Sequence, residues 1–418
     1  MSQHDGQGTT RRSLLKAAGM GSIATIGLAG CSSFTGDDGG PYTVGQAIPQ
    51  SGDLSVFGER SNRAREFSLS YINDATIDGR EVEYVVEDTN TNPQDGVSAA
   101  EKLVNQDNVP MMQAGLSSGV AIAIAESVTI PQETLHMAWG NSPEISGLDD
   151  NRYVMRTVPP NTLDSKALAE IAIEREGLTK LGIIHVNNSF GEGFADALEQ
   201  EVTAKGGEIT GRQAYEPGKA SYSPQLNGVM DGEPEGIAFI AYPQSFATMA
   251  QEAFEMGMKD KVQYFGVESL RSSETANNVP DEALNDIVGV NASPPDNDLT
   301  DQFLSEFNDE FDRDPDVWTG YFVDGIILQG LAIAAADEFE SPALRDSIYE
   351  VSRPPGTEFV YHEFEDAVEA LDNGEEINYQ GIGGSADVND AGDVGGSYVR
   401  WEYTDGEFAP QDYISVQA

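Results

Sequence analysis

Short apolar segments alternate with longer amphipathic segments along this chain, and this alternation limits the folds that it can adopt. The first set starts with YTVGQAI (42–48) and EVEYVVED (81–88), two expected strands that flank an expected helix over 58–74. Helices over 93–106 and 119–127 then alternate with expected strands at PMMQAG and TLHMAWG. Strands that alternate with helices form parallel sheets whose faces are covered by those helices.

A second set of the same kind begins near residue 160. Its expected strands read KLGIIHV, EITGRQAY, PEGIAFIAY and VQYFGV, and its expected helices read DSKALAEIAIEREG, GEGFADALEQEVTAKG and FATMAQEAFEMGM. Long helices are expected over 299–337, and short strands with Gly, Asn and Asp turns over 378–418. Two sets of β-α units predict an α/β fold with two doubly wound parallel-sheet domains.

The first 30 residues indicate a targeting segment rather than part of either domain. Arg11 and Arg12 stand together, Lys16 follows, and residues 17–30 form an apolar run of 14 residues. This run is shorter than the roughly 20 residues of a membrane-spanning helix. A basic start before a short apolar core predicts an export signal, and the paired arginines indicate the twin-arginine type. The alternative is an uncleaved anchor helix.

Cys31 is the only cysteine of the 418 residues, and it ends the sequence LAGC. This sequence resembles a lipobox, in which the chain is cut before the cysteine and lipid is attached to it. The acidic, glycine-rich residues 31–41 then predict a flexible tether. We therefore expect an exported protein that lipid on Cys31 holds to the outer face of the cell membrane; a chance free thiol is the alternative. On an exported chain, Asn187 and Asn291 begin two candidate glycosylation sequons.

The charge balance excludes one class of partner. The chain holds 71 acidic side chains and 23 Lys or Arg side chains, for a formal net charge of −48. Such a surface repels phosphates, so we expect no nucleic-acid partner. The charge also disfavours a compact state unless salt screens it, and at molar ionic strength the Debye length falls to about 3 Å. We therefore expect a protein of an extreme halophile, whose acidity reflects its habitat.

Candidate binding residues follow the expected strands, because ligands of open parallel sheets bind beyond the carboxyl ends of strands. Hydroxyls, aromatic rings, an amide and a carboxylate gather there: Ser51, Phe57, Ser117, Ser118, Asn141, Phe190, Tyr242 and Glu268. Ser117 and Ser118 start an apolar helix whose free N–H groups suit an anion, although an ordinary capping serine also fits this position. Glu268 follows the strand VQYFGV, where it is either a ligand for an ammonium group or one more solvated acid.

Signals for an enzyme are weak. His136, His185 and His362 are too far apart in sequence to indicate a metal motif, and the first two fall within expected strands. The sequence has no Gly-x-Ser-x-Gly elbow and no phosphate-binding loop. In FGEGFAD (190–196), Asp196 stands where a dinucleotide-binding loop has its last glycine. We expect no enzymatic activity, no cofactor and no metal.

Four stretches carry a family resemblance: SLSYINDATIDGREVEYVVEDTNTNPQDGVSAAEKLVNQDNV, SSGVAIAIAE, SFGEGFADAL and PDVWTGYFVDGIILQGLAIAAA. They resemble, in order along 42–418, the branched-chain amino-acid-binding (Leu/Ile/Val-binding) type of ABC-transporter substrate-binding protein. The resemblance implies the type I periplasmic-binding-protein fold, with two lobes and a three-crossover hinge. Residues 42–160 and 288–380 would form the first lobe, and residues 161–287 and 381–418 the second, after the signal with its lipobox (1–30) and the tether.

The resemblance implies that the first lobe binds a ligand carboxylate. Ser118, its neighbour Ser117, and Asn141 would hold this group, and backbone groups near Trp139 would contact the polar end of the ligand. The sequence departs from the family at two of these positions. Asn141 stands where threonine or serine is usual, and Trp139 is bulky where a small residue often occurs.

The second lobe would bind the other end of the ligand. By the same resemblance, Tyr242 and Glu268 would reach an ammonium group, and Phe57 and Phe190 would flank the ligand side chain, with Trp318 as a further wall. Phe57 stands where a tyrosine is common. These departures reshape the expected pocket, so leucine, isoleucine and valine do not follow as ligands from the resemblance alone.

The resemblance therefore implies a non-enzymatic receptor that captures an amino acid, branched-chain or similar, and delivers it to an ABC permease driven by an ATPase. A urea, short-amide or aromatic-acid ligand is an alternative, because relatives of this fold bind these solutes. Two readings from other classes stay open. One is a ligand-sensing receptor, which would usually add a spanning helix and an output domain, and the other is an extracellular hydrolase that acts through carboxylates.

Overall fold

The computed structural model describes residues 39–404 and 406–414, without the side chains of residues 273 and 274. The expected export signal, Cys31 and nearly all of the expected tether lie outside the described residues. Within the described part of the chain, no helix is both long enough and apolar enough to cross a membrane.

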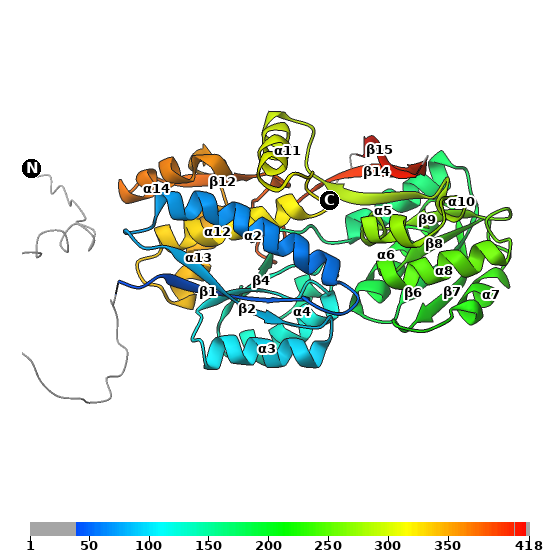
Figure 1. Cartoon of the computed structure of the whole chain (residues 1–418), viewed down its shortest axis with the longest axis horizontal. Helices are drawn as coiled ribbons and strands as arrows, with labels where there is room; N and C mark the ends of the chain where they lie inside the picture. The colour runs from blue at the N-terminus through cyan, green and yellow to red at the C-terminus, as the bar shows by residue number, and fades with distance from the viewer. Residues whose placement is uncertain (1–38, 405, 415–418) are drawn as a thin grey trace, which may run out of the picture. The chain divides into compact units, whose positions relative to one another are not determined.

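The first sheet holds five parallel strands in the order β2-β1-β3-β4-β5 (Figure 1). The strands are β1 (Tyr42–Ile48), β2 (Val82–Asp88), β3 (Met111–Ala114), β4 (Leu135–Ala138) and β5 (Val154–Arg156). The connecting helices are α2 (Ser55–Ala75), α3 (Pro93–Asn105), α4 (Ser118–Ile124) with its π-helical extension η1 (Ala125–Thr129), and the short η2 (Ile145–Gly147). Every residue of β3 and β4 is buried, because helices cover both faces of the sheet.

Helix α3 illustrates how the sequence determines where a helix begins and which of its faces is buried. The Asn92 side chain accepts a hydrogen bond from the backbone N–H of Gln94, and Pro93 occupies the first turn, where its missing N–H has no consequence. Ala100 and Leu103 on one face of the helix are buried in the core of the first sheet. The helix therefore begins where the sequence predicts it.

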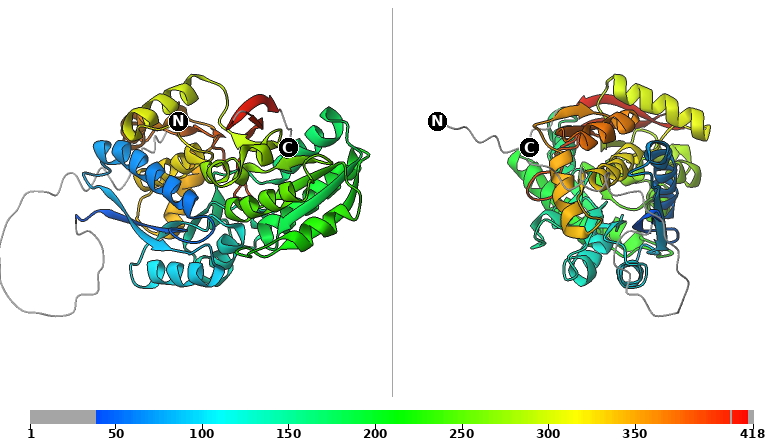
Figure 2. Two further views of the ribbon diagram at one scale, coloured as in Figure 1. Left: turned by 45° about the vertical axis from the view of Figure 1, so that its right-hand side comes forward. Right: turned by 90° about the vertical axis from the view of Figure 1, so that its left-hand side faces the viewer.

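The second sheet has the order β15-β14-β10-β9-β8-β6-β7. Its parallel part comprises β6 (Lys180–Val186), β7 (Glu208–Tyr215), β8 (Gly236–Ile240), β9 (Gln263–Gly266) and β10 (Val288–Ser293), and an antiparallel pair follows, β14 (Ser397–Thr404) and β15 (Glu407–Ile414). Its helices are α5 (Thr162–Ala169) with η3 (Glu170–Arg175), α6 (Ser189–Ala204), α7 (Ser223–Met230), α8 (Pro243–Glu255), η4 (Glu268–Leu270), α9 (Ser273–Asn278) and α10 (Asp281–Leu284). Figure 2 shows the C-terminal strand pair lying along the parallel strands.

A group of later helices returns to the first sheet. It comprises α11 (Asp298–Phe311), α12 (Thr319–Ala335), α13 (Ser341–Val351) and α14 (Phe364–Asp372), with η5 (Tyr361–Glu363) and the small sheet β11 (Thr357–Phe359), β12 (Ile377–Gly381) and β13 (Gly384–Ser385). Helix α12 packs against α2, α13 and α14 and is buried along almost its whole length (Figure 1). The Asp324 carboxylate ties α12 to this small sheet, because it accepts hydrogen bonds from Tyr379 Oη at 2.7 Å and from Gly383 N at 2.8 Å.

The chain passes between the two sheets three times, after β5, after β10 and after β13, as the expected two-lobe fold requires. Two expected boundaries are wrong. Strand β10 (Val288–Ser293) pairs with β9 and β14 in the second sheet, so residues 288–293 do not belong with the first lobe. Strand β10 runs parallel to β9, and only its pairing partners show that it belongs to the second sheet. The boundary expected after residue 380 falls inside β12, whose partner β13 follows it, so residues 381–385 do not belong with the second lobe. The boundary expected after residue 160 stays a prediction.

Candidate binding site

The carboxyl ends of strands from both sheets surround a small pocket. Its cavity volume is about 20 Å³, enough for about one water molecule. Segments that follow β1, β3 and β4 line one side, segments that follow β6, β8 and β9 line the other, and the residue before α12 completes the wall. The lining residues are Leu54, Phe57, Leu116, Ser117, Ser118, Asn141, Phe190, Tyr242, Ser269 and Trp318.

Ser117 directs its hydroxyl across the pocket and not to its own helix. It immediately precedes α4, but its side chain makes no capping hydrogen bond there. Its Oγ atom lies 3.1 Å from the hydroxyl of Tyr242, in the segment after β8. The neighbouring Ser118 Oγ atom accepts a hydrogen bond from Ser142 N at 3.1 Å. Gly140 permits this close approach, because a Cβ atom there would lie 2.7 Å from Ser118 Cα.

Tyr242 is held in place by groups of its own lobe. Asn188 Nδ2 donates to the Tyr242 hydroxyl at 2.8 Å, and Tyr242 N donates to the Tyr215 hydroxyl at 3.0 Å. The Tyr242 ring stacks on Phe190, with 6.0 Å between ring centroids and 11° between ring planes. Burial raises the pKa of Tyr242, so its hydroxyl keeps a proton at neutral pH. Because Asn188 donates to the oxygen, that proton is free to point at Ser117 or at a ligand oxygen.

Asn141 and Glu268 form the second contact between the lobes. Asn141 Nδ2 donates to Glu268 Oε1 at 2.8 Å, and both side chains are buried. The other carboxylate oxygen of Glu268 has no hydrogen-bond partner. Burial raises the pKa of Glu268 to about 7, and the hydrogen bond from Asn141 opposes this shift. The free oxygen can accept a hydrogen bond from a donor that reaches it.

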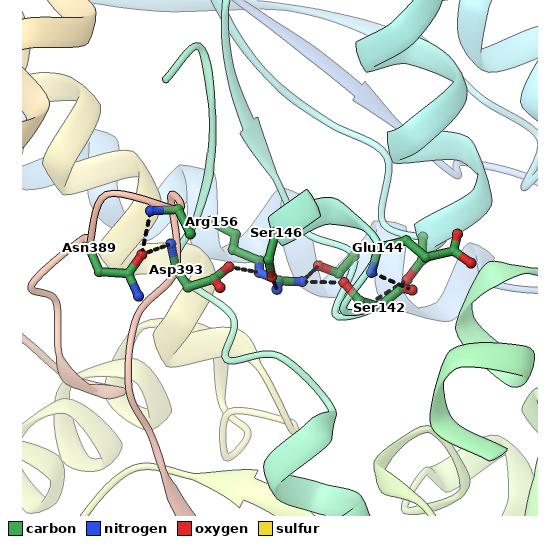
Figure 3. Close-up of polar contacts among 9 residues, drawn as sticks. Ser142, Glu144, Ser146, Arg156, Asn389 and Asp393 are labelled. Atoms are coloured by element: carbon green, nitrogen blue, oxygen red, sulfur yellow. Dashed lines mark hydrogen bonds and ion pairs between the residues drawn. The ribbon is translucent and has the colours of Figure 1, made fainter. Parts of the chain in front are cut away.

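A buried arginine supports the loop that carries Asn141 (Figure 3). Arg156 Nη1 donates to the carbonyl oxygens of Gly140 at 3.1 Å and Ser142 at 2.8 Å, on either side of Asn141. Its Nε atom donates to Asp393 Oδ1 at 2.7 Å. Asp393 belongs to the third segment that joins the sheets, so Arg156 links the pocket loop to that segment.

Aromatic rings in contact with one another form the apolar wall. The Phe57 and Trp318 ring centroids lie 5.4 Å apart, and Trp318 contacts Phe322, with 6.3 Å between centroids. Trp139 stacks on the other side of this group, 4.1 Å from Phe322. Trp318 lines both the pocket and a second cleft of about 370 Å³.

The structure brings most of the expected site residues together. Those that line the pocket are Phe57, Ser117, Ser118, Asn141, Phe190, Tyr242 and Trp318. Glu268 adjoins the pocket through Asn141, whereas Trp139 packs behind it. Ser51 bonds to Asp88 and does not line the pocket. The residues that sequence reasoning missed are Leu54, Leu116 and Ser269. The last two adjoin expected residues at strand ends, so the same rule could have found them.

The remaining motifs have structural explanations. His136 is buried and bonds to Ala114 O at 3.1 Å, and burial lowers its pKa to about 4, which keeps the ring neutral. Asn291, the start of one sequon, is buried in β10 and donates to Ala292 O, so a glycan cannot attach in this fold. Asn187, the start of the other, is exposed. No group of side chains within the described residues is arranged to hold a metal ion.

Two α/β lobes whose strand ends share one pocket define the class of two-lobed solute-binding proteins. A family model described as periplasmic binding protein matches residues 41–358. Because this match spans most of the chain, the chain belongs to that family, and it is a solute-binding protein of the ABC-transporter type.

Curated relatives extend the match over most of the chain. The chemotactic signal transduction system substrate-binding protein BasB of Halobacterium salinarum is 25% identical over 375 residues, which cover 88% of each chain. Leu/Ile/Val-binding protein homolog 3 of Brucella melitensis is 22% identical over 255 residues, which cover 60% of this chain and 68% of the relative. Both are named as binding proteins.

Solved structures confirm the expected fold. A leucine binding protein of Thermotoga maritima matches with a TM-score of 0.76 and 16% identity, over 89% of this chain and 98% of that chain. A branched-chain amino acid binding protein of Streptococcus pneumoniae in complex with isoleucine gives 0.72 and 15%, over 89% and 100%. A solute binding protein of R. palustris in complex with benzoate gives 0.71 and 17%, over 90% and 96%.

Proposed function

We propose that this chain captures an amino acid, branched-chain or similar, between its two lobes and delivers it to the permease of an ABC importer. The observation that carries this proposal is the pair of buried contacts between the lobes, Ser117 with Tyr242 and Asn141 with Glu268. In each contact, a ligand could insert between the two polar groups and bind both of them. Each lobe supplies one partner of each contact, so a ligand bound there favours the closed arrangement.

The chemistry of the pocket supports a ligand with two polar ends and an apolar body. The hydroxyls of Ser117 and Tyr242 can donate to a carboxylate, whereas the unpartnered oxygen of Glu268 suits an ammonium group. Phe57 and Phe190 offer apolar surface between them. The cavity of about 20 Å³ is smaller than any amino acid, so the lobes must separate for entry.

Thermal unfolding in molar salt tests this proposal. The panel would hold all twenty amino acids, urea, short amides and aromatic acids such as benzoate. A ligand at about 100 times its Kd adds roughly 2.7 kcal/mol to the free energy of unfolding. Stabilisation by one group of amino acids would support the proposal. Stabilisation only by an amide or an aromatic acid would keep the binding protein and reject the amino acid. Turnover of an amide would indicate the hydrolase.

A second candidate role is ligand presentation to a chemotaxis transducer, and the match to BasB along 88% of both chains favours it. This role uses the same pocket and differs in the membrane partner. Co-purification with a permease from the native membrane would support import, and co-purification with a transducer would support sensing.

The cell-surface location also belongs to the proposal. We infer that the twin-arginine signal exports the folded chain and that lipid on Cys31 anchors it to the outer membrane face, in an extreme halophile. The expected export signal and the origin of BasB in Halobacterium salinarum support this inference. Cys31→Ser should release the protein from the membrane fraction, and a variant that stays fully membrane-bound would contradict the lipid anchor.

A further inference from the structure

Several buried polar atoms near the pocket have no hydrogen-bond partner. They belong to two carboxyl groups, an amide and two phenols: Asp164 Oδ1, Glu268 Oε2, both amide atoms of Asn161, Tyr321 Oη and Tyr398 Oη. Buried polar atoms are almost always hydrogen-bonded in native proteins, so unpartnered atoms that gather in one place call for an explanation.

The arrangement of the chain places these groups together. Asn141 links two of the residues, because its backbone oxygen accepts from Asn161 N at 2.8 Å and its side chain donates to Glu268 Oε1 at 2.8 Å. Asp164 follows Asn161 by three residues, in the first turn of α5. Helix α5 packs on β10, and β10 packs on η4, which begins with Glu268. Asp164 and Glu268 therefore approach the same buried region from two elements of the second lobe.

The charged and titratable groups around this pair do not neutralise it. Each carboxyl is 1% exposed. Tyr321 on α12 and Tyr398 on β14 face Asp164, and burial raises the pKa of both phenols, so they stay uncharged. Arg156 on β5 is the cation that acts on Tyr398, but its guanidinium is bound to Asp393 and to backbone carbonyls.

Two buried carboxylates without a cation do not both ionise at neutral pH. Burial raises the pKa of Asp164 well above its usual value, and the charge of Glu268 raises it further. The pair therefore holds at least one proton near pH 7. Backbone hydrogen bonds to the Asp164 carboxyl oppose the rise in its pKa but do not cancel it. Of the four carboxyl oxygen atoms, Glu268 Oε1 accepts from Asn141, whereas Glu268 Oε2 and Asp164 Oδ1 have no hydrogen-bond partner.

We propose that Asp164 joins Glu268 in a two-carboxyl subsite that binds a protonated primary amine of the ligand and releases one proton as it does so. This inference rests on the proposed function and adds Asp164 as a specificity-determining residue. An R–NH₃⁺ group brings three N–H donors, and two of these would point at Glu268 Oε2 and Asp164 Oδ1. The carboxyl O–H bond breaks and its proton goes to solvent, while the amine keeps its charge and the pair changes from −1 to −2.

This subsite makes two demands on the ligand. A quaternary ammonium has no N–H to donate, so N-methylation should weaken binding even when the positive charge stays. A carboxylic acid without an amine gives the pair no reason to lose its proton, so binding of such an acid should release none at this subsite.

Isothermal titration calorimetry in molar potassium chloride, in two buffers of different ionisation enthalpy at pH 7, measures the number of protons released per ligand. The probes would be the amino acids that stabilise the wild type, their N,N,N-trimethyl derivatives, and benzoate. We expect about one proton released per amino acid, none with benzoate, and at least tenfold weaker binding of the trimethyl form. Asp164→Asn should bind the amino acid at least tenfold more weakly and release less than half a proton.

Asp260→Asn is the matched control, since it removes the same charge from an exposed position of the same lobe and should change neither quantity. Near-ultraviolet circular dichroism checks that Asp164→Asn is folded, and Glu268→Gln should show the same loss of proton release. Unchanged affinity and unchanged proton release in Asp164→Asn would overturn the subsite while the binding function stands. Binding of benzoate but of no amine would also overturn it, and binding of no solute would overturn the proposed function together with the subsite.

Discussion

Asn141 and Glu268 follow strands of different sheets, yet Asn141 Nδ2 donates to Glu268 Oε1 at 2.8 Å in a fully buried contact. The Ser117–Tyr242 contact of 3.1 Å repeats this relationship on the other side of the pocket. Under the proposed function, a ligand that enters the pocket exchanges these contacts for its own. The affinity for a ligand therefore measures the difference between two sets of hydrogen bonds and not the strength of one set.

Tyr242→Phe tests the hydroxyl end of the pocket. The change removes the bonds to Ser117 and Asn188 but keeps the stack on Phe190. A hydrogen bond to a charged group is worth about 1.5–3 kcal/mol, so we expect binding of a carboxylate ligand to weaken at least about tenfold. Calorimetry in molar salt would measure this change. The control is Tyr413→Phe, whose side chain is 49% exposed. Equal affinities of wild type and Tyr242→Phe would exclude a role of this hydroxyl in binding.

Glu268→Gln should make the free protein more stable at high pH. Burial raises the pKa of Glu268 from 4.5 to about 7, so folding favours its protonated form. The stability that this group contributes is present below pH 4.5 and is lost as the pH rises to 7. A glutamine side chain stays neutral, so the variant should exceed the wild type by up to about 3 kcal/mol above pH 7 and match it below pH 4.5.

Denaturant unfolding at pH 4.5, 6 and 8 in molar salt would measure this difference. Glu235→Gln is an instructive control, because Glu235 is exposed and hydrogen bonds from Thr179 and Lys180 lower its pKa. Its loss should therefore destabilise the protein at pH 8, which is the opposite sign. A Glu268→Gln variant that is less stable than the wild type at pH 8 would contradict burial as the dominant effect.

Most residues of the pocket could be predicted from the sequence, because the ends of strands can be recognised without knowing which strands pair. Apolar segments such as KLGIIHV and VQYFGV mark strands, and a parallel sheet brings their carboxyl ends to one edge. Asn141, Phe190 and Tyr242 lie at or shortly after the ends of such segments, and all three line the pocket. The rule needs only local hydrophobicity, which is why it worked in so acidic a chain.

Features that depend on distant partners could not be read in this way. The position of β10 in the second sheet depends on pairing with β14, more than 100 residues later in the chain. Trp139 stands at a strand end, but its ring turns away to stack on Phe322 of α12. Asp164 is one of 71 acidic residues, and nothing in the sequence separates it from the solvated ones. Burial alone gives it significance, and burial is a property of the packed fold.

Arg156→Met should strongly destabilise the protein and disturb the pocket. The change removes the Arg156 hydrogen bonds to the carbonyls of Gly140 and Ser142, of which Ser142 keeps only the bond from Ile145 N, and it removes the cation from Asp393. Breaking a buried ion pair by removing one partner costs about 3–5 kcal/mol. We expect a loss of this size in urea unfolding, with weaker solute binding because Asn141 loses its support. Arg175→Met is the control, since its pairs with Glu170 and Asp412 are partly exposed and worth less than about 1 kcal/mol. Equal losses in the two variants would contradict a special role for Arg156.

Trp318 has a strained backbone conformation, and its ring also shapes the pocket. Two substitutions at this position separate the two effects. Its φ angle is +74°, in the left-handed region that glycine adopts readily and that costs other residues about 1 kcal/mol or more. Trp318→Ala and Trp318→Gly both remove the ring that packs on Phe57 and lines the pocket and the 370 Å³ cleft, but only glycine also relieves the strain. We expect the glycine variant to be about 1 kcal/mol more stable than the alanine variant, as measured by urea unfolding.

Both Trp318 variants should also shift the solute panel toward larger ligands, because the cleft then extends the pocket. Trp401 serves as the comparison, since it is equally bulky and also buried but belongs to β14 of the C-terminal strand pair, where it contacts Phe408 of β15. Trp401→Phe should lower stability without changing the order of solutes. If the alanine and glycine variants of Trp318 are equally stable, the left-handed backbone carries no strain. If they also keep the ligand preference of the wild type, the Trp318 ring does not limit the size of the ligand.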